Sequence, residues 1–189
     1  DSIPEIYRVN AQDYKKRNMA YGHLVPDANT KYSEKARQDA YLLTNFVPQD
    51  PVLNGGLWIG LENKVREMAG RHLCMHVYTG SVFKPKEEHK VRSIKYFVTG
   101  VNDVGIPTHL FKVIYIFDYN KTLRHKVYLI PNKAIKISGE RNHLLEKHFL
   151  TGKKPKDKKD LLLKKYKVKT SILQIQKLSG MNFEQYYQD

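Results

Sequence analysis

The segment GLWIGLENKVREMAGR, residues 56–71, carries the strongest secondary-structure signal in the chain. Its apolar residues recur at spacings of three and four positions: Leu57, Trp58, Leu61, Val65, Met68 and Ala69. Because an α-helix turns once in about 3.6 residues, this spacing places them along one face. We therefore expect an amphipathic helix over Gly56–Arg71 that packs on a core.

Beyond this helix, runs rich in β-branched and aromatic residues are separated by Gly, Pro, Asn and Asp. They are His76–Thr79, Ser93–Thr99, Thr108–Phe117 and Lys126–Ile130, and they predict strands of one antiparallel sheet. The segment Asp118–His125 is long enough to join the last two as a hairpin. Before the helix, turn-forming residues prevail, and a short helix is expected at Ser33–Leu43 with Ser33 as its cap. The fold class is α+β.

Length and composition are those of one domain spanning residues 1–189. The chain has 189 residues, of which 41% are hydrophobic, and this suffices for a core of its own. No stretch approaches the roughly 18 uninterrupted apolar residues of a membrane helix, so no membrane partner is expected. The sequence begins at Asp1 without a methionine, and we expect either a removed leader or a fragment.

The formal net charge of +14 is the largest anomaly of the composition. An excess of this size attracts polyanions such as nucleic acid, heparin-like sugars or anionic membrane surfaces, although it also simply keeps a protein in solution. Half of it lies in residues 152–169, GKKPKDKKDLLLKKYKVK, where nine lysines face two aspartates. This segment is either a solvated lysine loop or a surface that binds phosphate groups electrostatically.

Two smaller features bear on the cellular compartment. Cys74 is the only cysteine, so no disulfide closes within these residues. Asn120-Lys121-Thr122 is a glycosylation sequon in a turn-like stretch, as a secreted protein would display it. Such triplets are common by chance, and the compartment stays open on these grounds.

Several common catalytic motifs are missing from the sequence: it has no GxxxxGK[ST] loop, no paired-cysteine zinc pattern, no HExxH and no GxSxG. Phosphodiester chemistry instead needs a base for water, a metal to neutralise charge, and cationic groups on the flanking phosphates. The segment His23–Arg66 contains all three kinds of group.

Ordered blocks across nearly the whole chain carry a family resemblance. They are GHLVP (22–26), TNFVPQ (44–49), LNGGLW (53–58) with Leu61-Glu62 and Arg66, VYTG (77–80), IPTHLFKV (106–113), LIPN (129–132) and IQKLSGMNF (175–183). With these blocks the chain resembles the DNA/RNA non-specific endonuclease family, and the Asn54-Gly55-Gly56 block and the sequon are most similar to secreted arthropod members. The resemblance implies a central antiparallel β-sheet flanked by helices, with a ββα-metal active site.

The resemblance also implies roles for individual residues. His23 is expected to be the general base, because a neutral imidazole accepts a proton from water near pH 7. Asn54 would be the direct ligand of Mg²⁺ or Mn²⁺ through its amide oxygen, a hard donor suited to such ions. Without the family, His23 reads as a structural loop histidine and Asn54 as a turn or helix-cap residue.

Three further residues complete the predicted site. Glu62 would hold water around the metal, and Arg66 would clamp a phosphate or the departing oxygen. Asn54, Trp58, Glu62 and Arg66 follow one another at four-residue spacing, so a single helix would carry them on one stripe. Asn45 would orient substrate or the catalytic loop. The alternatives are a Glu62–Arg66 surface pair and a backbone-capping role for Asn45, while Trp58 is expected in the core.

The chain departs from the family where Asp-Arg usually precedes Gly-His, because Ala20 and Tyr21 stand there. The expected activity is therefore reduced, unless Lys16 or Arg17 substitutes. Tyr21 and Arg66 are predicted to contact nucleic acid, together with Lys153, Lys154, Lys158 and Lys159. Since only 22 residues precede His23, N-terminal strands are expected to be missing, and an N-terminal fragment or second chain is a candidate partner.

The functional prediction is a sugar-non-specific endonuclease that hydrolyses DNA and RNA through backbone-directed contacts. The alternative is a non-specific nucleic-acid-binding protein with weak residual cleavage, and a third reading is a protein that binds heparin or membrane surfaces. The predicted location is extracellular, with an organelle as the alternative.

Overall fold

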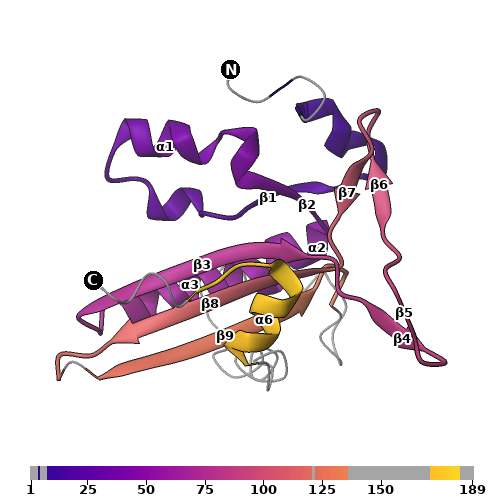
Figure 1. The fold of residues 1–189 in the computed structure, drawn as a ribbon. Helices are drawn as coiled ribbons and strands as arrows, with labels where there is room; N and C mark the ends of the chain where they lie inside the picture. Colours follow the sequence, from indigo (N-terminus) through magenta and orange to yellow (C-terminus); the bar gives the residue numbers. More distant parts are fainter. Residues whose placement is uncertain (1–3, 5–7, 121, 136–170, 184–189) are drawn as a thin grey trace.

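A three-stranded antiparallel sheet forms the centre of the computed structural model, which describes residues 4, 8–120, 122–135 and 171–183. The strands follow the order β3 (Cys74–Val82), β8 (His109–Phe117) and β9 (Leu123–Pro131). Helix α3 (Ile59–Ala69) covers one face and helix α6 (Ile172–Ser179) lies on the other (Figure 1). This confirms the α+β class and the flanked central sheet.

The side chains on the two faces of β8 belong to two separate hydrophobic clusters, because successive side chains of a strand point to opposite sides. Leu110, Ile114 and Ile116 pack with the α3 helix, while Phe111, Val113 and Tyr115 pack with α6. Both sets are buried. A strand buried on both faces has no solvated side, which explains the nearly continuous apolar run in its sequence.

The predicted hairpin and amphipathic helix are present with shifted bounds. The β8–β9 turn spans only residues 118–122, since β9 begins at Leu123. The helix starts earlier than predicted: α2 (Pro51–Leu53) leads into a π-helical turn at Asn54–Trp58, and α3 continues from there to Ala69. The expectation of a regular α-helix over Gly56–Arg71 was therefore wrong at its start.

The expectation of one sheet was also wrong, because three further strand pairs stand apart from it within the described residues. These ribbons are β1 (Ala20–His23) with β2 (Phe46–Gln49), β4 (Lys86–Glu88) with β5 (Val91–Ser93), and β6 (Phe97–Thr99) with β7 (Val104–Ile106). The predicted strand Ser93–Thr99 is thus split between β5 and β6. Each of these short strands forms its hydrogen bonds with a ribbon partner, so none joins the central sheet.

Helix α1 (Glu34–Ala40) confirms the short helix predicted near the N-terminus. Ser33 accepts a hydrogen bond from the amide of Ala36, as expected of a cap. Short 3₁₀-helices lie at Ala11–Arg17, Asp27–Asn29 and Leu43–Asn45. The last two and α1 make up the excursion between β1 and β2 (Figure 1).

A buried carboxylate joins the N-terminal 3₁₀-helix to the turn of the β6–β7 ribbon. Asp13 is 1% exposed, and its oxygens accept hydrogen bonds from the amides of Asn10, Val101 and Asn102 and from the Asn102 side chain. Burial alone raises the pKa of Asp13, but these hydrogen bonds together outweigh it and lower the pKa below its usual value. The folded state therefore favours the ionised form.

Replacing Asp13 with asparagine is expected to lower the free energy of unfolding by about 2–3 kcal/mol, because the new NH₂ group faces donors instead of accepting from them. Urea titration measures the loss. The folded pKa is lowered, so this contribution is present above the pKa of the unfolded chain and disappears as pH falls through the folded value. The control is Asp103→Asn on the exposed side of the same turn; equal losses in both variants would contradict the assignment.

Two sequence predictions, on membrane helices and on the lysine-rich segment, can be compared only with the residues that the structure describes. No helix among them is long and apolar enough to cross a membrane. The segment 152–169, with Lys153, Lys154, Lys158 and Lys159, lies outside them. Its role toward phosphates stays a prediction.

Candidate active site

Most of the predicted catalytic residues lie on a unit formed by β1, β2 and the helix that directly follows β2, while Asn45 ends the 3₁₀-helix just before β2. Asp50 ends the connection and caps the helix, since its carboxylate accepts hydrogen bonds from the amides of Val52 and Leu53 at 2.9 and 3.0 Å. Gly22 is required in β1, because a Cβ there would collide with the buried side chain of Gln49. Two strands followed by a helix are the ββα arrangement that the family resemblance implied.

His23 ends β1 opposite Phe46 and is held between aromatic rings. Its ring lies 4.5 Å from Phe46 and 5.3 Å from Tyr41, centroid to centroid, and its Nε2 atom is buried without a hydrogen-bond partner. Burial lowers the pKa of His23 below its usual value, and the nearby Asp27 carboxylate only partly opposes this. The imidazole is therefore neutral near pH 7 and able to accept a proton.

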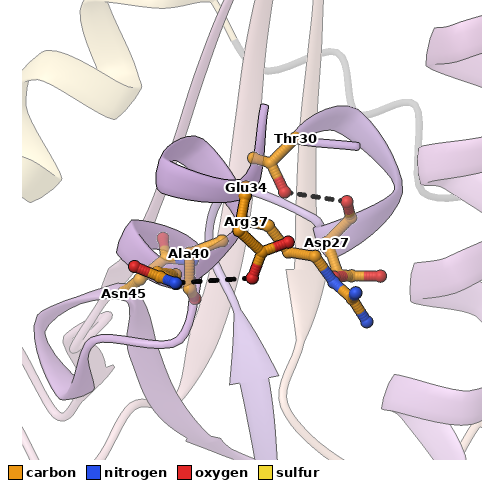
Figure 2. A network of polar contacts seen from close by, with 7 residues as sticks. Asp27, Thr30, Glu34, Arg37, Ala40 and Asn45 are labelled. Carbon is orange, nitrogen blue, oxygen red and sulfur yellow. Dashed lines mark hydrogen bonds and ion pairs between the residues drawn. The ribbon is translucent and has the colours of Figure 1, made fainter. Parts of the chain in front are cut away.

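Asn45 fixes the loop that follows His23. Its amide nitrogen donates to the carbonyls of Val25 and Ala40 at 2.9 and 2.8 Å, and its oxygen accepts from the Val25 amide at 2.9 Å. Figure 2 shows this side chain reaching α1, beside the turn where Thr30 and Arg37 contact Asp27. These contacts agree with both predicted roles of Asn45, as an orienter of the catalytic loop and as a backbone-capping residue.

Asn45→Ala is expected to lower the free energy of unfolding by about 1–3 kcal/mol, since three backbone groups lose their partner. It should also reduce cleavage by at least about tenfold, because His23 would no longer be held in place. Thermal melting and a cleavage assay measure the two effects. The exposed Gln38→Ala in α1 is the control, and normal cleavage by Asn45→Ala would show that the loop does not depend on it.

Asn54 and Glu62 offer oxygen atoms that no described hydrogen-bond donor occupies. The half-buried side chain of Asn54 makes no hydrogen bond, and a Cβ at Gly55 or Gly56 beside it would meet only open space. Glu62 is 9% exposed; burial raises its pKa, while Lys112, Arg66 and the Trp58 indole act to lower it. The indole nitrogen nevertheless makes no hydrogen bond of normal geometry.

The π-helical turn shows that one part of the sequence prediction was wrong. The four residues expected on a single stripe of one helix do not all lie on it: Asn54, Trp58, Glu62 and Arg66. A π turn closes hydrogen bonds five residues apart instead of four, so Asn54 is rotated away from the regular α-helical ladder. Such turns are frequent at functional sites. Only Trp58, Glu62 and Arg66 follow the α-helical spacing.

Arg66 connects α3 to the loop after His23. It donates to the Asn29 side chain at 3.1 Å and to that of Asn63, and no ion pair with Glu62 forms. The plain Glu62–Arg66 surface pair is therefore not what the structure contains. Because Asn29 belongs to the turn that follows β1, Arg66 lies next to the segment that carries His23.

The chain has Ala20 and Tyr21 where the family pattern has Asp-Arg, and the structure shows the contacts of Tyr21 and of the nearby Arg17. The Tyr21 hydroxyl donates to the carbonyl of Ala11, and its ring stacks on Tyr14 at 4.5 Å. Arg17 lies over the Phe97 ring at 4.9 Å. Arg17 is exposed, so its role as a substitute for the missing arginine stays a prediction, as does a contact of Tyr21 with nucleic acid.

Sequence reasoning missed two residues that shape the site. Asn132 accepts from the Asp50 amide at 2.9 Å and donates to the carbonyls of Pro48 and Pro107, and so ties the start of α2 to the sheet. Lys112 is 1% exposed and lies under Trp58. Its signal was visible: a lysine interrupts an otherwise apolar strand.

The residues present fit a Mg²⁺-like ion at Asn54. The fit rests on an unbonded amide oxygen and on the Glu62 carboxylate, both hard oxygen donors. Among the described residues, no three His, Cys, Asp or Glu side chains gather as a metal cluster. Mg²⁺ commonly keeps several waters and needs only one or two protein ligands.

Comparison with known proteins agrees with this geometry. The family model described as DNA/RNA non-specific endonuclease matches residues 1–189. Human "Endonuclease G, mitochondrial" is 35% identical over 136 residues, which cover 71% of this chain and 46% of the relative. The "Nuclease" of the fungus Syncephalastrum racemosum is 31% identical, with 70% and 44% covered.

A solved structure supports the fold independently. A chain from the structure titled "Crystal structure of the EndoG/EndoGI complex: Mechanism of EndoG inhibition" superposes with a TM-score of 0.69 at 29% identity, covering 74% of this chain and 58% of that one. This chain spans less than half the length of the curated relatives named above. From the full-length family match and the ββα unit that carries His23 and Asn54, the chain belongs to the DNA/RNA non-specific endonuclease family.

Proposed function

We propose that this chain is a metal-dependent, sugar-non-specific endonuclease that hydrolyses phosphodiester bonds of DNA and RNA. The observation that carries the proposal is a neutral histidine on β1 joined through the ββα unit to a helix with a free amide oxygen at Asn54. Family membership and the net charge of +14 support it. Contacts directed at the phosphate backbone carry no sequence information, which accounts for non-specific cutting.

In the proposed mechanism, Mg²⁺ or Mn²⁺ when bound neutralises negative charge on the phosphate. Asn54 would hold the ion, and the Glu62 carboxylate would orient water around it. Burial keeps the His23 ring neutral, so it takes a proton from the attacking water as the water oxygen bonds to phosphorus. The P–O bond to the departing oxygen breaks in the same step, and that oxygen takes a proton from solvent. Arg66, set beside the His23 loop by Asn29, pairs with a phosphate oxygen, while Asn45 keeps the loop in position.

Plasmid DNA and a single-stranded RNA, each incubated with Mg²⁺, with Mn²⁺ and with chelator, test the proposal. We expect both substrates to be nicked only with metal. Cleavage that persists in chelator would contradict the metal-dependent mechanism. If neither substrate is cut at any metal concentration, the endonuclease proposal is wrong.

A second candidate, a nucleic-acid-binding protein with weak cleavage, is favoured by one observation. Tyr21 stands where the family pattern has an arginine, and its hydroxyl donates a hydrogen bond to the Ala11 carbonyl of the same chain. A gel shift in chelator that weakens steeply with salt, without cleavage when metal is added, would support this candidate.

We further propose an organelle, specifically the mitochondrion, as the site of action. The printed names of the human and fission yeast relatives contain the word mitochondrial, which favours the organellar alternative over secretion. Import of the full-length protein into isolated mitochondria, followed by protease protection, tests this assignment.

A further inference from the structure

A buried lysine lies beneath the proposed site, on the sheet face that packs against α3. Lys112 is 1% exposed and sits on β8 between Leu110 and Ile114, which are fully buried. Lysine is almost never found in such a position without a partner, because removing an ammonium group from water is costly. Something must compensate for this burial.

The ammonium group of Lys112 contacts a hydroxyl group and an aromatic ring. Lys112 pairs with Thr79 across β8 and β3, and its Nζ donates to the Thr79 hydroxyl at 2.8 Å. The same Nζ lies 4.7 Å from the centre of the Trp58 ring, over its face, which is a cation–π geometry. One neutral hydrogen bond and one ring face are little compensation for a buried charge.

The remaining partner is Glu62, one helical turn after Trp58. Lys112 and Glu62 make no direct ion pair. Burial lowers the pKa of Lys112 to about 8 and raises that of Glu62, and the charge of each group opposes the shift of the other. Trp58 contacts the ammonium through its ring and lies four residues before Glu62 in the same helical segment, and both residues are buried. Lys112, Trp58 and Glu62 thus form a connected stack from the sheet to the site.

From this stack we propose that Lys112 is a positioning residue of the nuclease site, which holds the Glu62 carboxylate in place from the sheet side by charge attraction and through Trp58. The inference rests on the proposed nuclease function. A purely structural lysine would be the alternative, but an apolar residue of similar volume fills a core at no lower stability. The charge itself is therefore the feature that needs explaining.

The test compares Lys112→Met, Glu62→Gln and the double variant in the full chain. Lys112→Met keeps an unbranched side chain, shorter by one atom, and removes its charge. We expect kcat to fall by about 10–100-fold, as for other residues that orient a metal's surroundings, with the KM for DNA changed less than twofold and the melting temperature equal or higher. In the Glu62→Gln background, Lys112→Met should lower kcat by less than twofold, because its action passes through Glu62.

A second measurement does not depend on activity. Trp58 is the only tryptophan of the chain, so its fluorescence during a Mn²⁺ or Mg²⁺ titration reports on this site alone. We expect the midpoint of the titration to rise about tenfold in Lys112→Met and not to rise further when Glu62→Gln is added. The matched control is Lys126→Met, a lysine on β9 opposite Ile114 whose Nζ contacts Met68; it should leave both readouts unchanged.

The outcomes separate the two proposals. Independent, multiplicative effects of Lys112→Met and Glu62→Gln, or an unchanged kcat and midpoint, overturn the positioning role. If Lys112→Met does not fold, Thr79→Val decides in its place: it should lower kcat about threefold to tenfold alone and not at all with Glu62→Gln. If the wild-type protein binds metal without cutting nucleic acid, the nuclease function is overturned, and the fluorescence titration alone decides whether Lys112 positions Glu62. If the wild-type protein neither binds metal nor cuts, both proposals are overturned.

Discussion

Alanine in place of His23 is expected to lower kcat for plasmid cleavage by about 10²–10⁴-fold, the usual contribution of a general base. The imidazole is a neutral proton acceptor at the end of β1, and its Nε2 atom has no hydrogen-bond partner. Since the base acts only in the transition state, kcat and kcat/KM should fall together. Initial rates over a range of DNA concentrations measure both.

The exposed histidine of β9, His125, provides the matched control. His125→Ala should cleave like the wild type, and the affinity of His23→Ala for DNA in chelator should be nearly unchanged. A rate for His23→Ala within threefold of the wild type would remove His23 from the mechanism.

The pH dependence of the wild type follows from the same residue. The folded pKa of His23 is lowered by burial, so the neutral base persists below the usual range of histidine. Activity should be retained as pH falls toward the unshifted value near 6.5 and be lost only at lower pH, as the ring becomes protonated. A loss of activity that begins above pH 7 would contradict a lowered pKa at this position.

Leucine in place of Asn54 is expected to lower kcat by at least about 100-fold, because a direct ligand should matter more than the outer residues whose loss costs about 10–100-fold. Leucine has nearly the shape of asparagine and lacks the oxygen. The Trp58 fluorescence titration should also show a much weaker response to metal, since Trp58 ends the π turn that Asn54 begins.

Asn54→Asp separates loss of the ligand from damage to the turn. A carboxylate still offers an oxygen to the ion, so this variant should bind metal and regain cleavage as the metal concentration rises. Equal, full activity of Asn54→Leu and the wild type would mean that the ion is held elsewhere. Circular dichroism should show the same helical content in all three proteins.

Local pattern in the sequence determined much of this protein. The three- and four-residue spacing after Gly56 predicted α3, the β-branched runs predicted β8 and β9, and Ser33 predicted the start of α1. Neighbouring residues decide such features, because hydrophobic periodicity and capping act within a few positions. The ordered blocks around His23, Asn45 and Asn54 likewise indicated the family, and with it the predicted residues of the site.

Only the tertiary structure decided which of these residues meet and what surrounds them. It pairs Arg66 with Asn29 instead of Glu62, directs Tyr21 to Ala11, and inserts a π turn where the sequence predicted a regular α-helix. It also buries Lys112 beneath Trp58. These contacts join residues far apart in the chain, and burial is set by the packing of α3 on the sheet, so no local pattern reports the desolvation that lowers the pKa of His23 and raises that of Glu62.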